Sequence, residues 1–91
     1  MKKTFLITSE YGIHARPATR LVNLAASFAC DVDLSALGRT INLKSIMGLM
    51  SLGIYKGEIV TIKTDGEDQE EAIAAIAVFM KKEAIGEEVQ A

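Results

Sequence analysis

The chain has 91 residues, of which 49% are apolar, so it can build one hydrophobic core but is too short for two domains. Its net charge of −2 and aromatic content of 5% argue against a nucleic-acid-binding protein, since such proteins carry basic stripes and stacking aromatics. A single cysteine and a single histidine exclude an internal disulfide and the common zinc-ligand spacings, and no apolar run reaches the length of a membrane span.

The first half of the chain begins with a strand and continues with a helix. Lys3–Thr8 alternates, with Phe5 and Ile7 on one face. After a loop, residues 15–29 have helical spacing, and Pro17 fits the first turn, where its missing N–H costs nothing. The core-facing positions of this helix are Ala18, Leu21, Val22, Ala25 and Phe28.

The middle of the chain predicts a hairpin, a short helix and a further strand. Residues 31–35 and 39–43 alternate on either side of a turn at 36–38. Ser45 is typical of an N-cap, and the helix that it begins ends near Leu52, before a glycine. Residues 58–64 then form a third alternating segment.

The last predicted element is a helix that starts at Asp68. Glu71 stands three residues later and completes a capping-box-like pair. The helix frays after Ile85 and Gly86, and its buried face is predicted to contain Ala72, Ile76, Phe79 and Met80. The element order βαββαβα predicts a two-layer α+β sandwich with helices on one face of the sheet and solvent on the other.

The segment from Gly12 to Ala18 brings together groups that can hold phosphate. His14 stands between a glycine-containing loop and the start of a helix. A helix N-terminus has unpaired N–H groups and partial positive charge, so it binds phosphate and disfavours a protonated imidazole. Arg16 adds a planar, always charged donor fork. The pattern predicts that His14 attacks phosphorus and that Arg16 stabilises the phosphoryl oxygens.

A structural interpretation of the same segment is equally open. A histidine beside a helix is often a capping or surface residue, and Arg16 can be a solvated charge. No general base, triad or metal cluster stands beside His14 in the sequence. Whatever its chemistry, His14 therefore needs help from another protein.

The short helix after Ser45 is apolar around much of its circumference. Leu49 can face the core, whereas Ile46, Met47 and Met50 lie on a neighbouring stripe. Exposed methionines suit an adaptable docking surface, and the alternative is that they pack under a loop. A phosphate on Ser45 itself would be tolerated by the helix dipole and would add negative charge to this surface.

Two segments carry a resemblance to a known family. They are residues 12–19, Gly-Ile-His-Ala-Arg-Pro-Ala-Thr, and residues 42–53, Asn-Leu-Lys-Ser-Ile-Met-Gly-Leu-Met-Ser-Leu-Gly. From about Lys3 to about Glu83 the chain resembles HPr, the histidine-containing phosphocarrier of the bacterial sugar phosphotransferase system. The resemblance implies an open-faced β-sandwich in which a four-stranded antiparallel sheet is covered on one face by three helices.

The resemblance also implies a relay. His14 would accept phosphate on Nδ1 from enzyme I, with Arg16 beside it, and pass it to the A domains of sugar-specific enzymes II. Ser45 corresponds to the serine that HPr kinase/phosphorylase modifies in many Gram-positive members, which gives a corepressor for a catabolite control protein. Many relatives carry a small or apolar residue where Arg20 stands. The implied partner-binding residues are Ala15, Thr19, Arg20, Ile46, Met47 and Met50.

Three functions are weighed on this sequence. The favoured one is a phosphoryl carrier, a covalent intermediate of sugar uptake rather than an enzyme. The second is a regulatory interaction protein that acts mainly through Ser45 in carbon catabolite repression. The third, a small-ligand-binding α/β domain, leaves the histidine–arginine segment unexplained. We expect a single domain, 1–91, that is a cytoplasmic monomer without metal or cofactor, without direct nucleic-acid binding and without membrane insertion.

Overall fold

The computed structural model describes residues 1–90, and its elements follow the predicted order with one additional strand at the end. The strands are β1 (Lys2–Ile7), β2 (Asp31–Ala36), β3 (Arg39–Asn42), β4 (Ile59–Asp65) and β5 (Gly86–Val89). The helices are α1 (Ala15–Ala26), α2 (Ile46–Ser51) and α3 (Gln69–Lys82). Because α1 ends at Ala26 rather than near Ala29, Phe28 packs against the core from the loop that follows.

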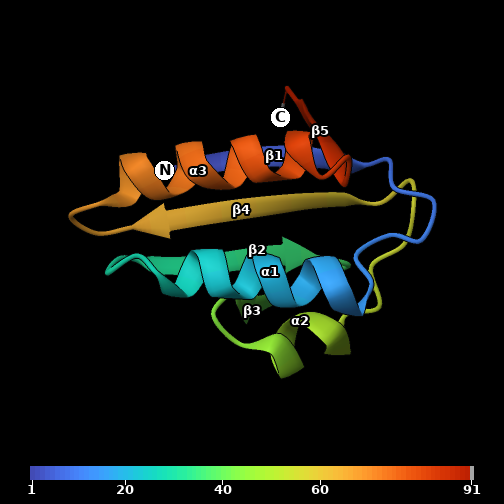
Figure 1. The fold of residues 1–91 in the computed structure, drawn as a ribbon, viewed down its shortest axis with the longest axis horizontal. Helices are drawn as coiled ribbons and strands as arrows, with labels where there is room; N and C mark the ends of the chain where they lie inside the picture. Colours follow the sequence, from blue (N-terminus) through green and yellow to red (C-terminus); the bar gives the residue numbers. More distant parts are fainter. Residues whose placement is uncertain (91) are drawn as a thin grey trace.

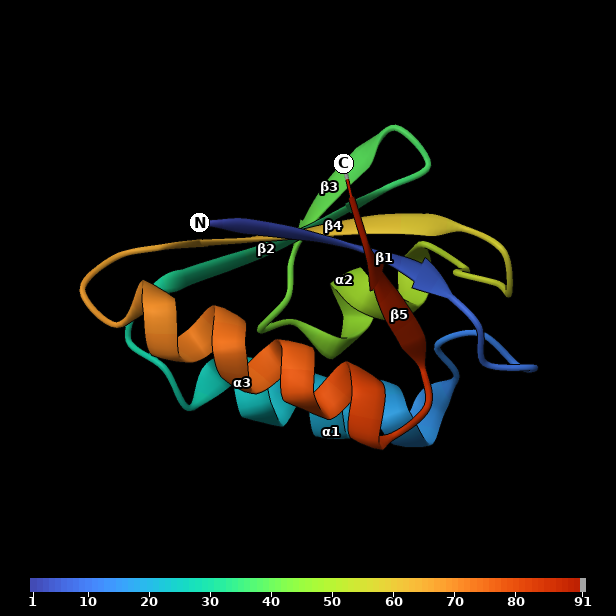
Figure 2. The same cartoon turned by 90° about the horizontal axis from the view of Figure 1, so that it is seen from above.

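The strands form one antiparallel sheet in the order β3-β2-β4-β1-β5. Helices α1 and α3 lie side by side across one face of this sheet, and α2 lies beside α1 next to β3 (Figure 1, Figure 2). The loop before α1 and the loop after α2 run together at one end of the molecule (Figure 1). The predicted α+β sandwich with helices on a single face is therefore confirmed.

Alternation along the strands separates the two faces of the sheet. In β1, Phe5 and Ile7 are buried under the helices, as predicted from their spacing. Thr4 lies on the opposite face, opposite Thr61 of β4, and the two Oγ1 atoms are 3.2 Å apart. One face is thus apolar and packed, and the other is open and largely polar, with Ile59 exposed on it.

The prediction of four strands, with a chain that frays after Ile85 and Gly86, is wrong. Ile85 is buried, its N–H donates to the Met80 carbonyl at 2.9 Å, and its own carbonyl accepts the Ser9 N–H at 3.1 Å. Gly86 lets the chain approach β1 closely, since a Cβ there would lie 2.7 Å from the Leu6 carbonyl oxygen. The residues that follow pair with β1 as strand β5.

Asp68 is the N-cap residue of α3, as predicted, but the predicted capping box is wrong because its side chain does not cap the helix. The carboxylate instead accepts the N–H of Ala29 at 2.8 Å and the N–H of Cys30 at 2.9 Å. These contacts tie the start of α3 to the loop between α1 and β2. The hydrogen bond from Ala29, more than any other contact, holds the pKa of Asp68 below its usual value.

The pH dependence of unfolding should reveal this contact. In the unfolded chain the Asp68 carboxyl has a pKa of about 3.9, and its lower pKa in the folded chain means that folding favours the ionised form. Its stabilisation is complete above about pH 5 and is lost as the pH falls through the folded-state pKa. Urea unfolding of wild type and Asp68→Asn should give free energies that differ most near neutrality and converge in acid. A difference that stays constant down to the lowest pH at which wild type folds would contradict this assignment.

Candidate functional site

The loop before α1 is fixed by two backbone hydrogen bonds, one donated by Gly12 and one by Ile13. The Gly12 N–H donates to the Ser9 carbonyl at 3.0 Å, and the next N–H, from Ile13, donates to the Ile54 carbonyl at 3.2 Å. Gly12 has a φ of +65°, and a Cβ there would overlap the Ile54 carbonyl oxygen, so only glycine fits. Since the Ile13 side chain is also buried, the chain enters α1 from a fixed point.

His14 is the N-cap residue of α1, and its side chain is exposed. Its carbonyl accepts the Ala18 N–H at 3.0 Å, but its imidazole makes no capping hydrogen bond. The N–H groups of Ala15 and Arg16 stand before the first possible intrahelical acceptor, and Pro17 has none to donate. The first turn contains no acidic residue to offset the positive end of the helix. The imidazole is therefore free at a site that favours anions.

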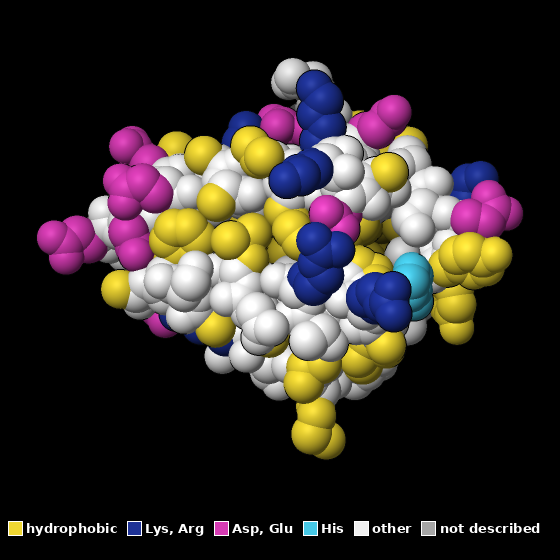
Figure 3. Space-filling view, in the orientation of Figure 1, with side chains coloured by type: hydrophobic (Ala, Val, Ile, Leu, Met, Phe, Trp, Pro, Cys, Tyr) yellow, Lys and Arg dark blue, Asp and Glu magenta, His cyan; other side chains and the backbone are white. Residues whose placement is uncertain are grey.

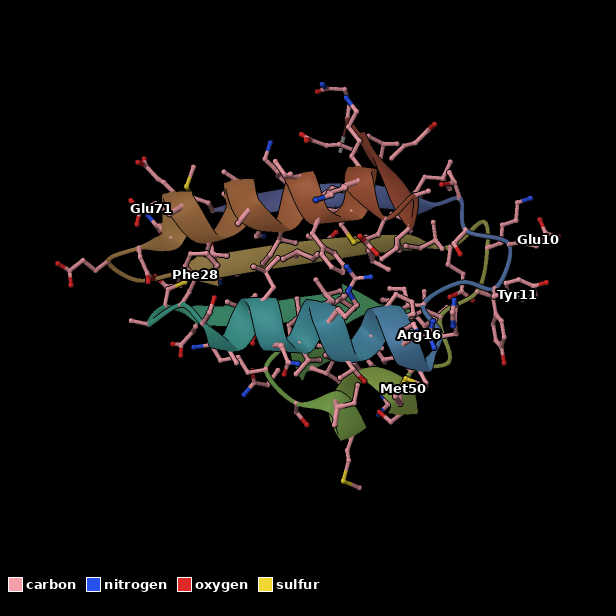
Figure 4. All side chains as sticks on the ribbon, viewed as in Figure 1. Glu10, Tyr11, Arg16, Phe28, Met50 and Glu71 are labelled. Atoms are coloured by element: carbon pink, nitrogen blue, oxygen red, sulfur yellow. The ribbon has the colours of Figure 1, made fainter. Side chains whose placement is uncertain are left out.

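Arg16 stands in the first turn of α1 and is exposed. Within residues 1–90 its guanidinium takes part in no ion pair. Figure 4 shows Arg16 at the same end of the molecule as Tyr11 and Met50, and Figure 3 shows the histidine flanked there by basic and apolar side chains. His14 and Arg16 are thus both exposed at the end of the molecule where α1 begins.

Arg20 lies one turn further along α1 and has a different environment. Its Nη1 and Nη2 donate to the two carboxylate oxygens of Glu83 at 2.6 and 3.1 Å, and its guanidinium lies 5.9 Å from the centre of the Phe79 ring. The Arg20 guanidinium is therefore ion-paired, and it joins α1 to the end of α3. Thr19 is exposed, and its Oγ1 donates to the Ala15 carbonyl at 2.9 Å. A role of these residues in partner binding stays a prediction.

The second candidate segment surrounds α2. Ser45 is its N-cap, and Oγ accepts the Gly48 N–H at 3.1 Å, so the predicted cap is confirmed. The apolar residues on the outer side of α2 do not pack under a loop. We call them the α2 patch, and their exposed fractions are 37% for Ile46, 81% for Met47 and 43% for Met50.

The candidate site is an open surface and not a pocket. A hollow of about 590 Å³ lies between α3 and β5, and a second one of about 380 Å³ lies against β1 and β5. Neither is lined by any of the candidate residues. Within residues 1–90, no three potential ligands are grouped to hold a metal ion, and no helix is both long and apolar enough to cross a bilayer.

Tyr11 is a neighbour of His14 that sequence reasoning missed. The centres of the two rings are 6.0 Å apart, and the ring planes meet at 84°, which is an edge-to-face arrangement. The available signal was an aromatic residue in a loop three positions before the histidine. That signal is weak, because nothing local shows where the ring points.

Comparison with known proteins identifies the family. Residues 1–82 match the family model described as the PTS HPr component phosphorylation site. The chain belongs to the HPr family. A solved HPr, the histidine-containing phosphocarrier protein of Mycoplasma, is 38% identical and superposes with a TM-score of 0.92, over 94% of this chain and 98% of that one. HPr from Bacillus anthracis is 42% identical, over 87% of this chain and 94% of that one, with a TM-score of 0.81.

The structural relatives of this HPr-family chain also include a protein linked to regulation. Crh, the catabolite repression protein of Bacillus subtilis, is 43% identical over 82% of this chain and 86% of that one, with a TM-score of 0.71. That protein is described as a dimer with a swapped domain. HPr proteins are phosphocarriers of the phosphotransferase system, so the resemblance seen in the sequence is confirmed at the level of family and fold.

Replacing Gly12 should destabilise the protein more than replacing a left-handed glycine that has open space around it. Gly12→Ala combines an unfavourable φ with overlap at Ile54, and we expect it to lower the free energy of unfolding by about 2–3 kcal/mol. Gly38→Ala is the matched control, because Gly38 has a φ of +76° but open space around it, and should cost about 1 kcal/mol. Urea unfolding measures the free energy of unfolding of both variants. Equal losses would show that the overlap with Ile54 adds nothing to the cost of the unfavourable φ.

Proposed function

We propose that this chain carries a phosphoryl group on His14, accepting it from enzyme I and donating it to the A domains of enzymes II in sugar uptake. The proposal is supported above all by an exposed imidazole at the N-cap of α1 that makes no capping hydrogen bond. A second support is Arg16, an exposed arginine two residues later that has no ion-pair partner within residues 1–90. A purely capping histidine would have its ring nitrogen occupied.

Transfer then proceeds as an in-line displacement at phosphorus. The lone pair of the neutral imidazole, at Nδ1, forms a P–N bond while the bond between phosphorus and the donor atom of enzyme I breaks. The N–H groups of Ala15 and Arg16 and the Arg16 guanidinium stabilise the charge on the equatorial oxygens. Catalysis of this type consists mainly of positioning and charge stabilisation. In the second transfer the labile P–N bond breaks as a nucleophile of the enzyme II A domain attacks.

The proposed partners would cover the open site in turn. A carrier must present phosphorus to two different proteins, so an exposed histidine suits it better than an enclosed one. The α2 patch offers apolar surface beside the site, and methionines adapt to differently shaped partners. We propose that Ala15, Thr19 and Arg20 complete the contact area on α1. We also propose that the protein acts in the cytoplasm, as a monomer.

Labelling with phosphoenolpyruvate and purified enzyme I tests the carrier function. Wild type should acquire an acid-labile phosphate, and His14→Ala should acquire none. Arg16→Ala should slow transfer roughly ten- to a hundred-fold, because a charged contact to the phosphoryl group is lost. Its thermal unfolding should be unchanged, since the side chain is exposed. Phosphate uptake by His14→Ala would end the carrier proposal, and an unaltered rate in Arg16→Ala would make Arg16 a surface charge.

A second candidate function is regulation through Ser45. Ser45 Oγ lies at the N-cap of α2, beside the α2 patch, so a phosphate there would add up to about two negative charges to the proposed docking surface. A relative linked to catabolite repression favours this candidate. The proposed partners are HPr kinase/phosphorylase and a catabolite control protein. Both functions can reside in one chain, because His14 and Ser45 are different acceptors.

Incubation with ATP and HPr kinase/phosphorylase tests the regulatory function. Wild type should acquire an acid-stable phosphate that is absent from Ser45→Ala. Ser51→Ala is the matched control, since Ser51 is an exposed serine at the other end of α2, and its labelling should equal that of wild type. Ser45→Ala should also lose about 1 kcal/mol of stability with its N-cap. Undiminished labelling of Ser45→Ala would refute regulation at this residue.

A further inference from the structure

We infer that Tyr11 is a positioning residue for phosphoryl transfer, whose ring restricts the orientation of the His14 imidazole. The inference deepens the function proposed for His14 and rests on it. It begins from the edge-to-face contact between the two rings, 6.0 Å between centres and 84° between planes. Within residues 1–90 this is the single aromatic pair, and the His14 side chain makes no capping hydrogen bond. The Tyr11 ring is thus the one aromatic group that contacts the imidazole within the described residues.

The backbone presents the Tyr11 ring from a fixed position. Tyr11 is the third residue of the turn that the Gly12 N–H closes on the Ser9 carbonyl at 3.0 Å. Before the turn, the Ser9 N–H donates to the Ile85 carbonyl at 3.1 Å, and after it the chain is held to Ile54. Figure 4 shows the Tyr11 side chain projecting from this loop at the end of the molecule where α1 begins. A ring on such a turn can limit the movement of a neighbour.

Burial does not explain Tyr11. Its side chain is 76% exposed, so it contributes little to the core. An exposed aromatic ring against an exposed imidazole has instead a local effect, which is to favour one rotamer of His14. Transfer requires the attacking nitrogen in line with the bond that breaks, and a ring that is already oriented loses less freedom on reaching that geometry. The energy of an aromatic pair corresponds to a rate effect of roughly two- to ten-fold.

Nuclear magnetic resonance of the full chain tests the orientation directly, without any phosphoryl transfer. The Cα–Cβ rotamer of His14 is read from three-bond couplings, and the imidazole C–H shifts report the ring current of Tyr11. Tyr11→Phe should keep both, and Tyr11→Ser should give averaged couplings and lose the ring-current shift. Tyr55→Ser is the matched control, because Tyr55 is 68% exposed on the neighbouring loop and makes no ring contact with His14. Unchanged couplings in Tyr11→Ser would overturn the inference.

Kinetics with enzyme I then separates this inference from the function on which it rests. Tyr11→Ser should lower kcat roughly two- to ten-fold with little change in KM, and Tyr11→Phe should restore the wild-type rate. A loss confined to KM, or a Tyr11→Phe variant as slow as Tyr11→Ser, would overturn the positioning role. If wild type itself takes up no phosphate, the proposed function fails, while the couplings still decide whether Tyr11 orients the imidazole.

Discussion

The hydrogen bond from the Ile13 N–H to the Ile54 carbonyl constrains the geometry of the end of the molecule at which α1 begins. It joins the loop before α1 to the loop after α2, and it forms only because Gly12 has no side chain to keep the two loops apart. The start of one helix and the end of another are therefore fixed relative to each other (Figure 1). Under the proposed function, a partner that docks on the α2 patch would find His14 at a constant position relative to the patch.

Helix α2 has one side that packs on the core and one side that does not. It buries Leu49 and leaves the α2 patch in water, although apolar surface is stabilising only when it is covered. Core packing therefore accounts for one side of α2 and not for the other. Under the proposed function, docking would account for the outer side, since methionine side chains have several rotatable bonds and fit surfaces of different shape. The same helix begins at Ser45, so a modification there would act on the patch directly.

Local patterns predicted the parts of this fold that local physics determines. Strand alternation located β1 to β4, because a sheet packed on one face needs an apolar side chain at every second position. The N-cap at Ser45 was also predicted, because a capping side chain bonds to a backbone N–H only a few residues away. Strand β5 was not predicted, since its charged residues show no alternation and its place depends on the close approach of Gly86 to β1. Asp68 was assigned a local partner, whereas tertiary contacts give it the N–H groups of Ala29 and Cys30.

The two arginines of α1 show why the chemistry of a site needs tertiary structure as well as spacing. Arg16 and Arg20 are one turn apart on α1, and nothing in their spacing shows which of them has an ion-pair partner. Glu83 accepts hydrogen bonds from both terminal nitrogens of Arg20, so that guanidinium links α1 to the end of α3. Arg16 has no ion-pair partner in the described part of the chain, so under the proposed function its donors would be available to an incoming anion. The ion pair also links α1 to the end of α3, so under the proposed function an arriving phosphate would meet the N-terminus of a helix that is joined to the rest of the domain.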